Sequence, residues 1–129
     1  MTATFTVMSM DELDKKVEDD RRALAKRMRA GTAHWGHWWY VLDQDTGVLR
    51  YRDSEGHELC EIDLARCDTA TEILDWVLQT EGKAWATDED LGSLVRALTD
   101  LLPIRNWTQD PMARHDVAAS IRETLTLAD

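Results

Sequence analysis

The sequence has little of several residue types, and each scarcity argues against a class of protein. Two cysteines and two prolines among 129 residues indicate neither a disulfide-dense scaffold nor a proline-rich linker. No stretch approaches the roughly 20 apolar residues that a membrane span needs, and the N-terminus lacks the basic and apolar pattern of a secretory signal. We therefore expect a cytoplasmic protein with reduced cysteines and no contact with a membrane.

Basic residues are also scarce. The chain has 15 Lys and Arg against 25 Asp and Glu, a net charge of −10 at pH 7. The imbalance is local, because twelve acids lie from Asp53 to Asp90 with only Arg66 and Lys83 between them. Such a field repels phosphate backbones and attracts basic surfaces. The charge predicts a protein partner with a basic surface and no direct binding to nucleic acid.

Sequence motifs of catalysis are missing as well. The chain has no glycine-rich phosphate loop, no nucleophile elbow and no H-E-x-x-H pair, which are the patterns that would place catalytic groups together. Paired carboxylates are frequent, but in so acidic a chain their frequency carries no information. The sequence predicts a non-enzymatic protein without a cofactor.

What is present indicates one α+β domain over residues 1–129. This length and a composition of 43% hydrophobic and 31% charged residues suit a globular domain that buries about two-thirds of its unfolded surface.

Residues 2–7 alternate small polar and apolar residues, as in an edge strand. Ser9 and Glu12 form a capping box for a helix ending at residue 29 or 30 before Gly31. Its narrow apolar stripe comprises Leu13, Val17, Leu24 and Met28.

Two turn signals then predict a three-stranded antiparallel β-meander. "DQDTG" (43–47) and "SEGH" (54–57) separate three short segments of strand-forming residues. If they close the loops, Tyr40 faces Tyr51, and Tyr51 in turn faces Cys60. One face of the sheet then collects the apolar residues Trp38, Tyr40, Leu42, Leu49, Tyr51, Cys60, Ile62 and Leu64.

The opposite face of this sheet mixes aromatic, charged and apolar residues. It is expected to carry His37, Trp39, Val41, Val48, Arg50, Arg52, Leu59, Glu61 and Asp63. Arg50 opposite Glu61 and Trp39 opposite Arg52 are the expected cross-strand pairs. Because this face is half apolar and carries no catalytic motif, we predict that it binds the partner; the alternative is that the helix over residues 9–30 or a neighbouring chain covers it. The residues assigned to the contact are Trp39, Arg50, Arg52, Glu55, Glu58, Glu61 and Asp63.

Three helices are predicted after the sheet. The first starts at Thr69 or Thr71 and stops at Gly82, with a broad apolar face of Ile73, Leu74, Trp76, Val77 and Leu78. The second opens at Thr87 and ends before Pro103, and the short join makes the two antiparallel neighbours, with Trp85 filling the gap between them. The third opens at Asp110-Pro111 and continues along Ala113, Val117, Ile121 and Leu125. Two of the three are expected to cover the apolar face of the sheet.

The stretch "HWGHWWY" (34–40) leaves three alternatives open. His34 and His37 with His57 and Cys60 have the spacing of two halves of a zinc tetrad, and Cys67 is a spare ligand. Residues three apart on a strand point to opposite faces, however, so His57 and Cys60 cannot share an ion unless both segments are turns. Trp39 with Arg50 and Arg52 could instead stack a base. The third alternative is simply the start of a strand, which we favour.

Residues 58–102 contain the series I-D-L-x-x-C, L-D-W and K-x-W-A-T. With this series, the segment resembles a set of small uncharacterised proteins of bacterial and mobile-element (phage and plasmid) genomes. It implies no activity, and it raises the expectation of a phage, plasmid or defence role.

We conclude that the sequence favours a small acidic binding protein. Our hypothesis is an inhibitor of the phage or mobile-element type that occupies a basic surface of a nucleic-acid-processing complex. The alternative is a small metal-binding protein or enzyme that uses histidines near the sheet. Self-association through the first helix into a homo-oligomer is a third hypothesis.

Overall fold

The first helix, α1 (Met10–Ala30), has the ends that the sequence predicted. The Ser9 side chain accepts a hydrogen bond of 3.1 Å from the Glu12 amide, and Gly31 ends the helix in the left-handed conformation at φ 74°. The expected apolar stripe is buried only at its C-terminal end. Leu24 and Met28 are in the core, whereas Leu13 and Val17 are each 44% exposed.

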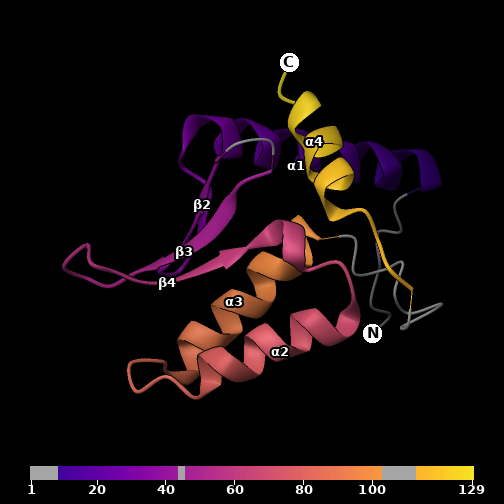
Figure 1. Ribbon diagram of the computed structural model, residues 1–129. Coiled ribbons are helices and arrows are strands. Elements are labelled where there is room, and N and C mark those ends of the chain that lie inside the picture. Colours follow the sequence, from indigo (N-terminus) through magenta and orange to yellow (C-terminus); the bar gives the residue numbers. More distant parts are fainter. Residues whose placement is uncertain (1–8, 44–45, 103–112) are drawn as a thin grey trace, which may run out of the picture.

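The computed structural model describes residues 9–43, 46–102 and 113–129. In Figure 1, α1 lies beside α4 (Val117–Thr126) at one side of the sheet, and α3 (Asp88–Leu101) lies between the sheet and α2 (Ala70–Glu81). The α+β class is confirmed. The strand predicted at 2–7 and the helix start predicted at Asp110 fall outside the described residues.

Within the described residues the sheet has four strands, so the prediction of a three-stranded meander was wrong. β1 (His34–Trp35), β2 (Trp38–Val41), β3 (Val48–Arg52) and β4 (Glu58–Asp63) lie side by side in chain order and are all antiparallel. "HWGHWWY" is therefore a hairpin. Gly36 at φ 57° allows a two-residue turn between the partners Trp35 and Trp38. A strand of two residues is too short to show alternation, which explains why it was missed.

One of the two predicted registers is confirmed and the other is shifted. Tyr51 faces Cys60 and Leu49 faces Ile62, as expected. Between β2 and β3, Trp38 rather than Tyr40 faces Tyr51, because the chain leaves the strand at Leu42, which is 41% exposed. The shift is two residues, so the paired side chains of β2 and β3 keep their predicted faces of the sheet.

The segments after the sheet begin at capping residues. Asp63 caps a short 3-10 turn, η1 (Leu64–Arg66), and Thr69 and Thr87 cap α2 and α3. The last helix begins at Val117 with Asp116 as its cap, whose carboxylate accepts the Ala119 amide at 3.0 Å. Ala113 was expected in this helix but lies before it. The helix therefore starts later in the chain than predicted, because the Asp116 carboxylate directly before Val117 caps it there.

A single core cluster joins the inner face of the sheet to the helices. It includes Trp38, Tyr40, Leu49, Ile62, Leu94, Leu98, Met28, Ile121 and Leu125. Trp85, from the α2–α3 connection, does more than fill the gap between helices. It stacks on Tyr51 with ring centroids 4.1 Å apart, and Trp38 meets Tyr51 edge-on at 5.2 Å. These three rings join the α2–α3 connection to the sheet.

Candidate functional site

One row of side chains crosses the outer face of the sheet through all four strands. His34 pairs with Trp39, Trp39 with Arg50, and Arg50 with Glu61. Residues directly opposite in antiparallel strands project to the same side, so the row presents imidazole, indole, guanidinium and carboxylate in order. This row is the centre of the candidate site.

Trp39 is held between two groups on this face. The His34 ring stacks on it with centroids 4.5 Å apart and planes 22° apart. The guanidinium carbon of Arg52 lies 5.4 Å from the indole centroid, a cation–π contact. The sequence predicted the Trp39–Arg52 contact as a directly opposite pair, whereas the shifted register makes it a diagonal one.

A β-bulge brings a further carboxylate to the outer face. The register changes between Tyr51 and Arg52, so that Arg52 pairs with Glu58 and Leu59 is the extra residue of β4. Glu58 then lies 3.6 Å from the guanidinium groups of both Arg50 and Arg52. No turn residue in the sequence signals this bulge.

The two arginines on this face are neutralised by neighbouring acids, but loosely. Arg50 also meets Glu61 at 3.8 Å, and these separations are longer than hydrogen bonds. The Nε of Arg50 is buried and has no hydrogen-bond partner. A phosphate approaching this face would meet Glu58 beside both guanidinium groups and Glu61 beside that of Arg50, which counts against the base-stacking alternative.

The remaining residues assigned to the partner contact lie at the two ends of β4. Asp63 accepts a hydrogen bond of 3.1 Å from the Ala65 amide and caps η1, while Glu55 lies in the β3–β4 turn. His37 was expected on the outer face but lies in the β1–β2 turn. Its ring is tilted toward Tyr51 at 5.6 Å. The structure thus gathers Trp39, Arg50, Arg52, Glu58 and Glu61 and leaves Asp63 and Glu55 at the margins.

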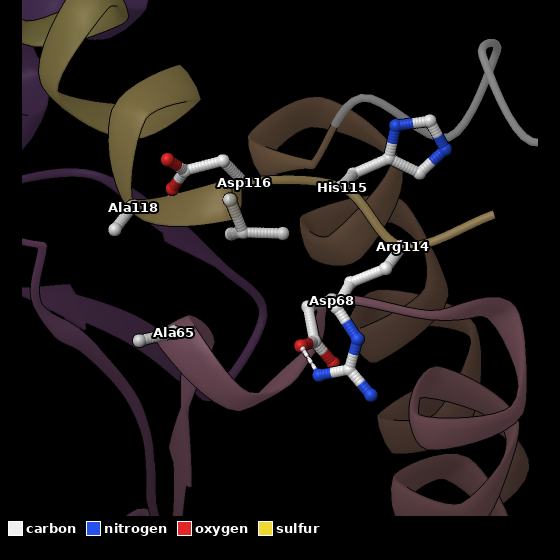
Figure 2. Close-up of a pocket in the computed structure, with 7 residues that line it drawn as sticks. Ala65, Asp68, Arg114, His115, Asp116 and Ala118 are labelled. Carbon is white, nitrogen blue, oxygen red and sulfur yellow. Dashed lines mark hydrogen bonds and ion pairs between the residues drawn. The ribbon is translucent and has the colours of Figure 1, made fainter.

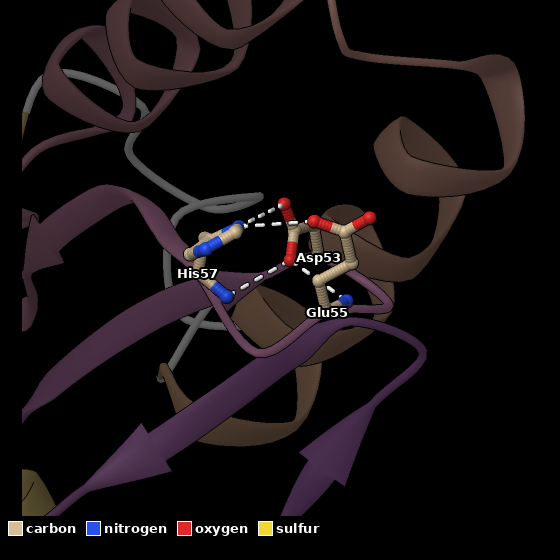
Figure 3. A network of polar contacts seen from close by, with 3 residues as sticks. All are labelled: Asp53, Glu55 and His57. Atoms are coloured by element: carbon tan, nitrogen blue, oxygen red, sulfur yellow. Dashed lines mark hydrogen bonds and ion pairs between the residues drawn. The ribbon is translucent and has the colours of Figure 1, made fainter.

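The zinc tetrad considered from the sequence is not assembled. Cys60 packs against the core, and His34 stacks on Trp39. Among the described residues, the group whose ligand atoms all lie within 4.8 Å of one another is Asp53, Glu55 and His57 (Figure 3). One Asp53 oxygen accepts the backbone amides of Glu55 and His57 at 2.9 and 2.8 Å. These bonds lower the pKa of Asp53, with the amide of His57 as the largest cause.

A shallow pocket lies where η1 meets the segment before α4 (Figure 2). Its polar groups already have partners. Arg114 pairs with Asp68, the His115 amide donates to the Asp68 carbonyl at 2.8 Å, and Asp116 caps α4. Arg114 and His115 thus tie the segment before α4 to Asp68, which follows η1, and this explains the polar side chains without a ligand.

Burial raises the pKa of several tyrosines and cysteines among the described residues. Burial raises the pKa of Tyr40 to about 12, against an opposing effect of Arg29. Burial, followed by the hydrogen bond with Asp90, raises the pKa of Tyr51 to about 12. Burial likewise raises the pKa of the Cys67 thiol to about 12, and that of Cys60 to a smaller extent. Each shift stabilises a neutral, unreactive form at neutral pH.

Comparisons with known proteins add no assignment: no protein-family model matches the chain, and neither curated proteins nor solved structures gave a match. None of the helices in the described part of the chain has both the length and the apolar character to cross a membrane.

Proposed function

We propose that this protein is a non-enzymatic acidic binding protein that occupies a basic surface of a protein partner. The observation that carries the proposal is the exposure of its acids. Between residues 53 and 90, the exposed basic residues are Arg66 and Lys83. The exposed acids of the same segment are Glu55, Glu58, Glu61, Asp63, Glu72, Asp75, Glu81, Asp88 and Glu89.

The outer face of the sheet supplies the first contact region in this proposal. Trp39 is a large aromatic ring on a rigid strand, and such residues are enriched among those that dominate interface energies. Because Glu58 and Glu61 hold the two arginines only at 3.6 to 3.8 Å, incoming basic side chains can compete for these carboxylates. A nucleic-acid-processing complex is the class of target we propose, since its basic surfaces are the ones an acidic protein can block.

Capture of partners by the immobilised protein tests this proposal. The bait is compared with the E58Q/E61Q variant, which neutralises the outer-face acids, and with D19N/D20N, which removes the same charge from exposed positions on α1. We expect a protein with a basic surface to be retained by the wild type and by D19N/D20N and lost from E58Q/E61Q. Equal retention by all three baits would contradict the proposal.

Metal binding is the second candidate function, and the cluster of Asp53, Glu55 and His57 favours it. Two carboxylates and an imidazole are a donor set that zinc accepts. Titration with zinc, followed by amide shifts in NMR spectra, distinguishes the two candidates. Shifts confined to residues 53–57 and abolished in H57A, but not in H37A, would support the metal site.

A further inference from the structure

The helix α2 has an apolar face that the rest of the described protein covers only in part. The sequence predicted a broad apolar face of five large residues on this helix. None of them is fully buried: Ile73, Trp76 and Val77 are half-buried, while Leu74 and Leu78 are each 57% exposed. The reason is the placement of α2, which packs mainly on α3 rather than on the sheet (Figure 1).

The neighbouring helix α3 contributes matching residues. Val95 is 48% exposed and Leu91 is half-buried. Asp100 lies on the side of α3 that faces β1, because it accepts a hydrogen bond of 2.8 Å from the Trp35 indole. Leu91 precedes Asp100 by two and a half helical turns at about 3.6 residues per turn. It therefore lies on the opposite side of α3, away from β1.

The antiparallel arrangement of α2 and α3 places these residues at matching levels along the two helices. Leu78 comes three residues before the end of α2 and Leu91 three residues after the start of α3. Leu74 and Val95 lie one helical turn further from the connection. The four side chains, Leu74, Leu78, Leu91 and Val95, thus form two opposed pairs, which we name the α2–α3 stripe.

Acidic side chains outnumber basic ones on the two helices that carry the α2–α3 stripe, although Asp100 lies on the β1 side of α3. The exposed acids of these two helices are Glu72, Asp75, Glu81, Asp88, Glu89 and Asp100, whereas Lys83 and Arg96 are the exposed bases from residue 70 to residue 101. An apolar stripe bordered by one sign of charge fits a helix whose own stripe is bordered by the opposite sign. A second copy of the chain would bring the same acids and a net charge of −10 and would be repelled.

We infer that the α2–α3 stripe docks a basic amphipathic helix of a partner protein. The inference rests on the proposed function for the basic character of the partner and adds where and in what form the partner binds. The partner helix would place leucine-like side chains at i and i+4 between the two opposed pairs, with lysine or arginine at its flanks facing Asp75, Glu81 and Asp88.

A designed peptide tests the inference. The probe is an amphipathic peptide of leucine and lysine of about 15 residues, long enough to form a helix on binding. Two control peptides are a scrambled version without an apolar stripe and a leucine–glutamate version. Binding is measured by fluorescence anisotropy with the full chain and mapped by amide shifts in NMR spectra. We expect the leucine–lysine peptide alone to bind, with shifts concentrated between residues 74 and 95.

The matched variants are L74Q/L78Q and L42Q/L59Q. All four leucines are exposed, at 57, 57, 41 and 42%, so neither variant empties the core. We expect L74Q/L78Q to weaken peptide binding about tenfold, through the loss of two apolar contacts, and L42Q/L59Q to leave it unchanged. Circular dichroism checks that both variants remain folded.

Several outcomes would overturn this inference and leave the proposed function standing. They are equal binding by both variants, amide shifts on the outer face of the sheet around Trp39 and Arg50, and no binding of the leucine–lysine peptide. A dimer in sedimentation that L74Q/L78Q dissociates would also overturn it, because the occupant would then be a second copy. The proposed function is tested by a separate experiment. Equal capture of partners by the E58Q/E61Q and wild-type baits would contradict it.

Discussion

The indole N–H of Trp38 donates a hydrogen bond of 3.0 Å to the backbone carbonyl of Asp90, at the start of α3. Trp38 is fully buried, and this bond joins the inner face of β2 to the helix above it. The next residue, Trp39, points to the outer face and is only half-buried. Two adjacent tryptophans therefore have different roles, one in the core and one in the candidate site.

Alanine substitution should separate these two roles. We expect Trp38→Ala to reduce the free energy of unfolding by about 3–5 kcal/mol, since it empties a buried site. Trp39→Ala should cost about 1 kcal/mol, the scale of an exposed cation–π and stacking contact. Urea denaturation measures both. Equal losses would mean that the assignment of inner and outer faces is wrong.

Two glycines with positive φ should differ in their tolerance of alanine. Gly47 (φ 93°) and Gly56 (φ 85°) have similar positive φ angles, so an alanine would be strained to a similar degree at either position. A Cβ at Gly47 would lie 2.6 Å from the Val41 carbonyl oxygen, whereas a Cβ at Gly56 meets nothing within 4 Å. We expect Gly56→Ala to cost about 1–2 kcal/mol from left-handed strain alone, and Gly47→Ala to cost more. Thermal or urea unfolding of the two variants checks this order.

The tyrosines should make the protein sensitive to alkali. Tyr40 and Tyr51 are the two tyrosines of the chain, and both have a pKa raised to about 12 from the usual value near 10. A raised folded-state pKa stabilises the fold below pH 10, and this contribution is lost as the pH rises from about 10 to 12.

The near-ultraviolet absorbance of phenolate measures this titration. We expect little phenolate at pH 11 in the folded protein. At higher pH, phenolate should appear together with the loss of the circular dichroism signal. Titration of both tyrosines near pH 10 with the fold intact would contradict their burial. Denatured protein, in which both should titrate near 10, is the reference.

The two free thiols should react at different rates. Cys67 is fully buried and its pKa is raised to about 12, so its thiolate is scarce at neutral pH. Cys60 is half-buried, and the nearby Lys83 opposes the effect of burial on its pKa. We expect iodoacetamide to label Cys60 slowly and Cys67 only after unfolding. Mass spectrometry of the native protein and of C60S measures this, and native labelling of C60S would contradict it.

The faces of the sheet could be predicted because alternation survives a shift of two residues. Trp38, Tyr40 and Leu49 are in the core although the β2–β3 register was wrong. Capping residues likewise predicted both ends of α1 and the end of α2 at Gly82, and Thr69 is the one of the two predicted starts that caps α2, since a cap is a local interaction between a side chain and nearby amides.

Features that depend on distant parts of the chain were missed. The bulge at Leu59, which brings Glu58 to Arg50 and Arg52, leaves no local signal. The exposure of Leu74 and Leu78 was missed for a similar reason. An amphipathic pattern predicts that a helix has an apolar face but does not say whether the fold has room to cover it. Here α3 lies against the sheet, and α2 packs on α3.

The most direct test of the proposed acidic interaction is the association rate with the purified captured partner as a function of ionic strength. If exposed acids guide the encounter, the association rate constant should fall steeply as the Debye length shortens from about 30 Å at 0.01 M salt to about 8 Å at 0.15 M. The dissociation rate should change little, and E58Q/E61Q should show a shallower dependence. An association rate that is independent of salt, and equal for both proteins, would contradict the account.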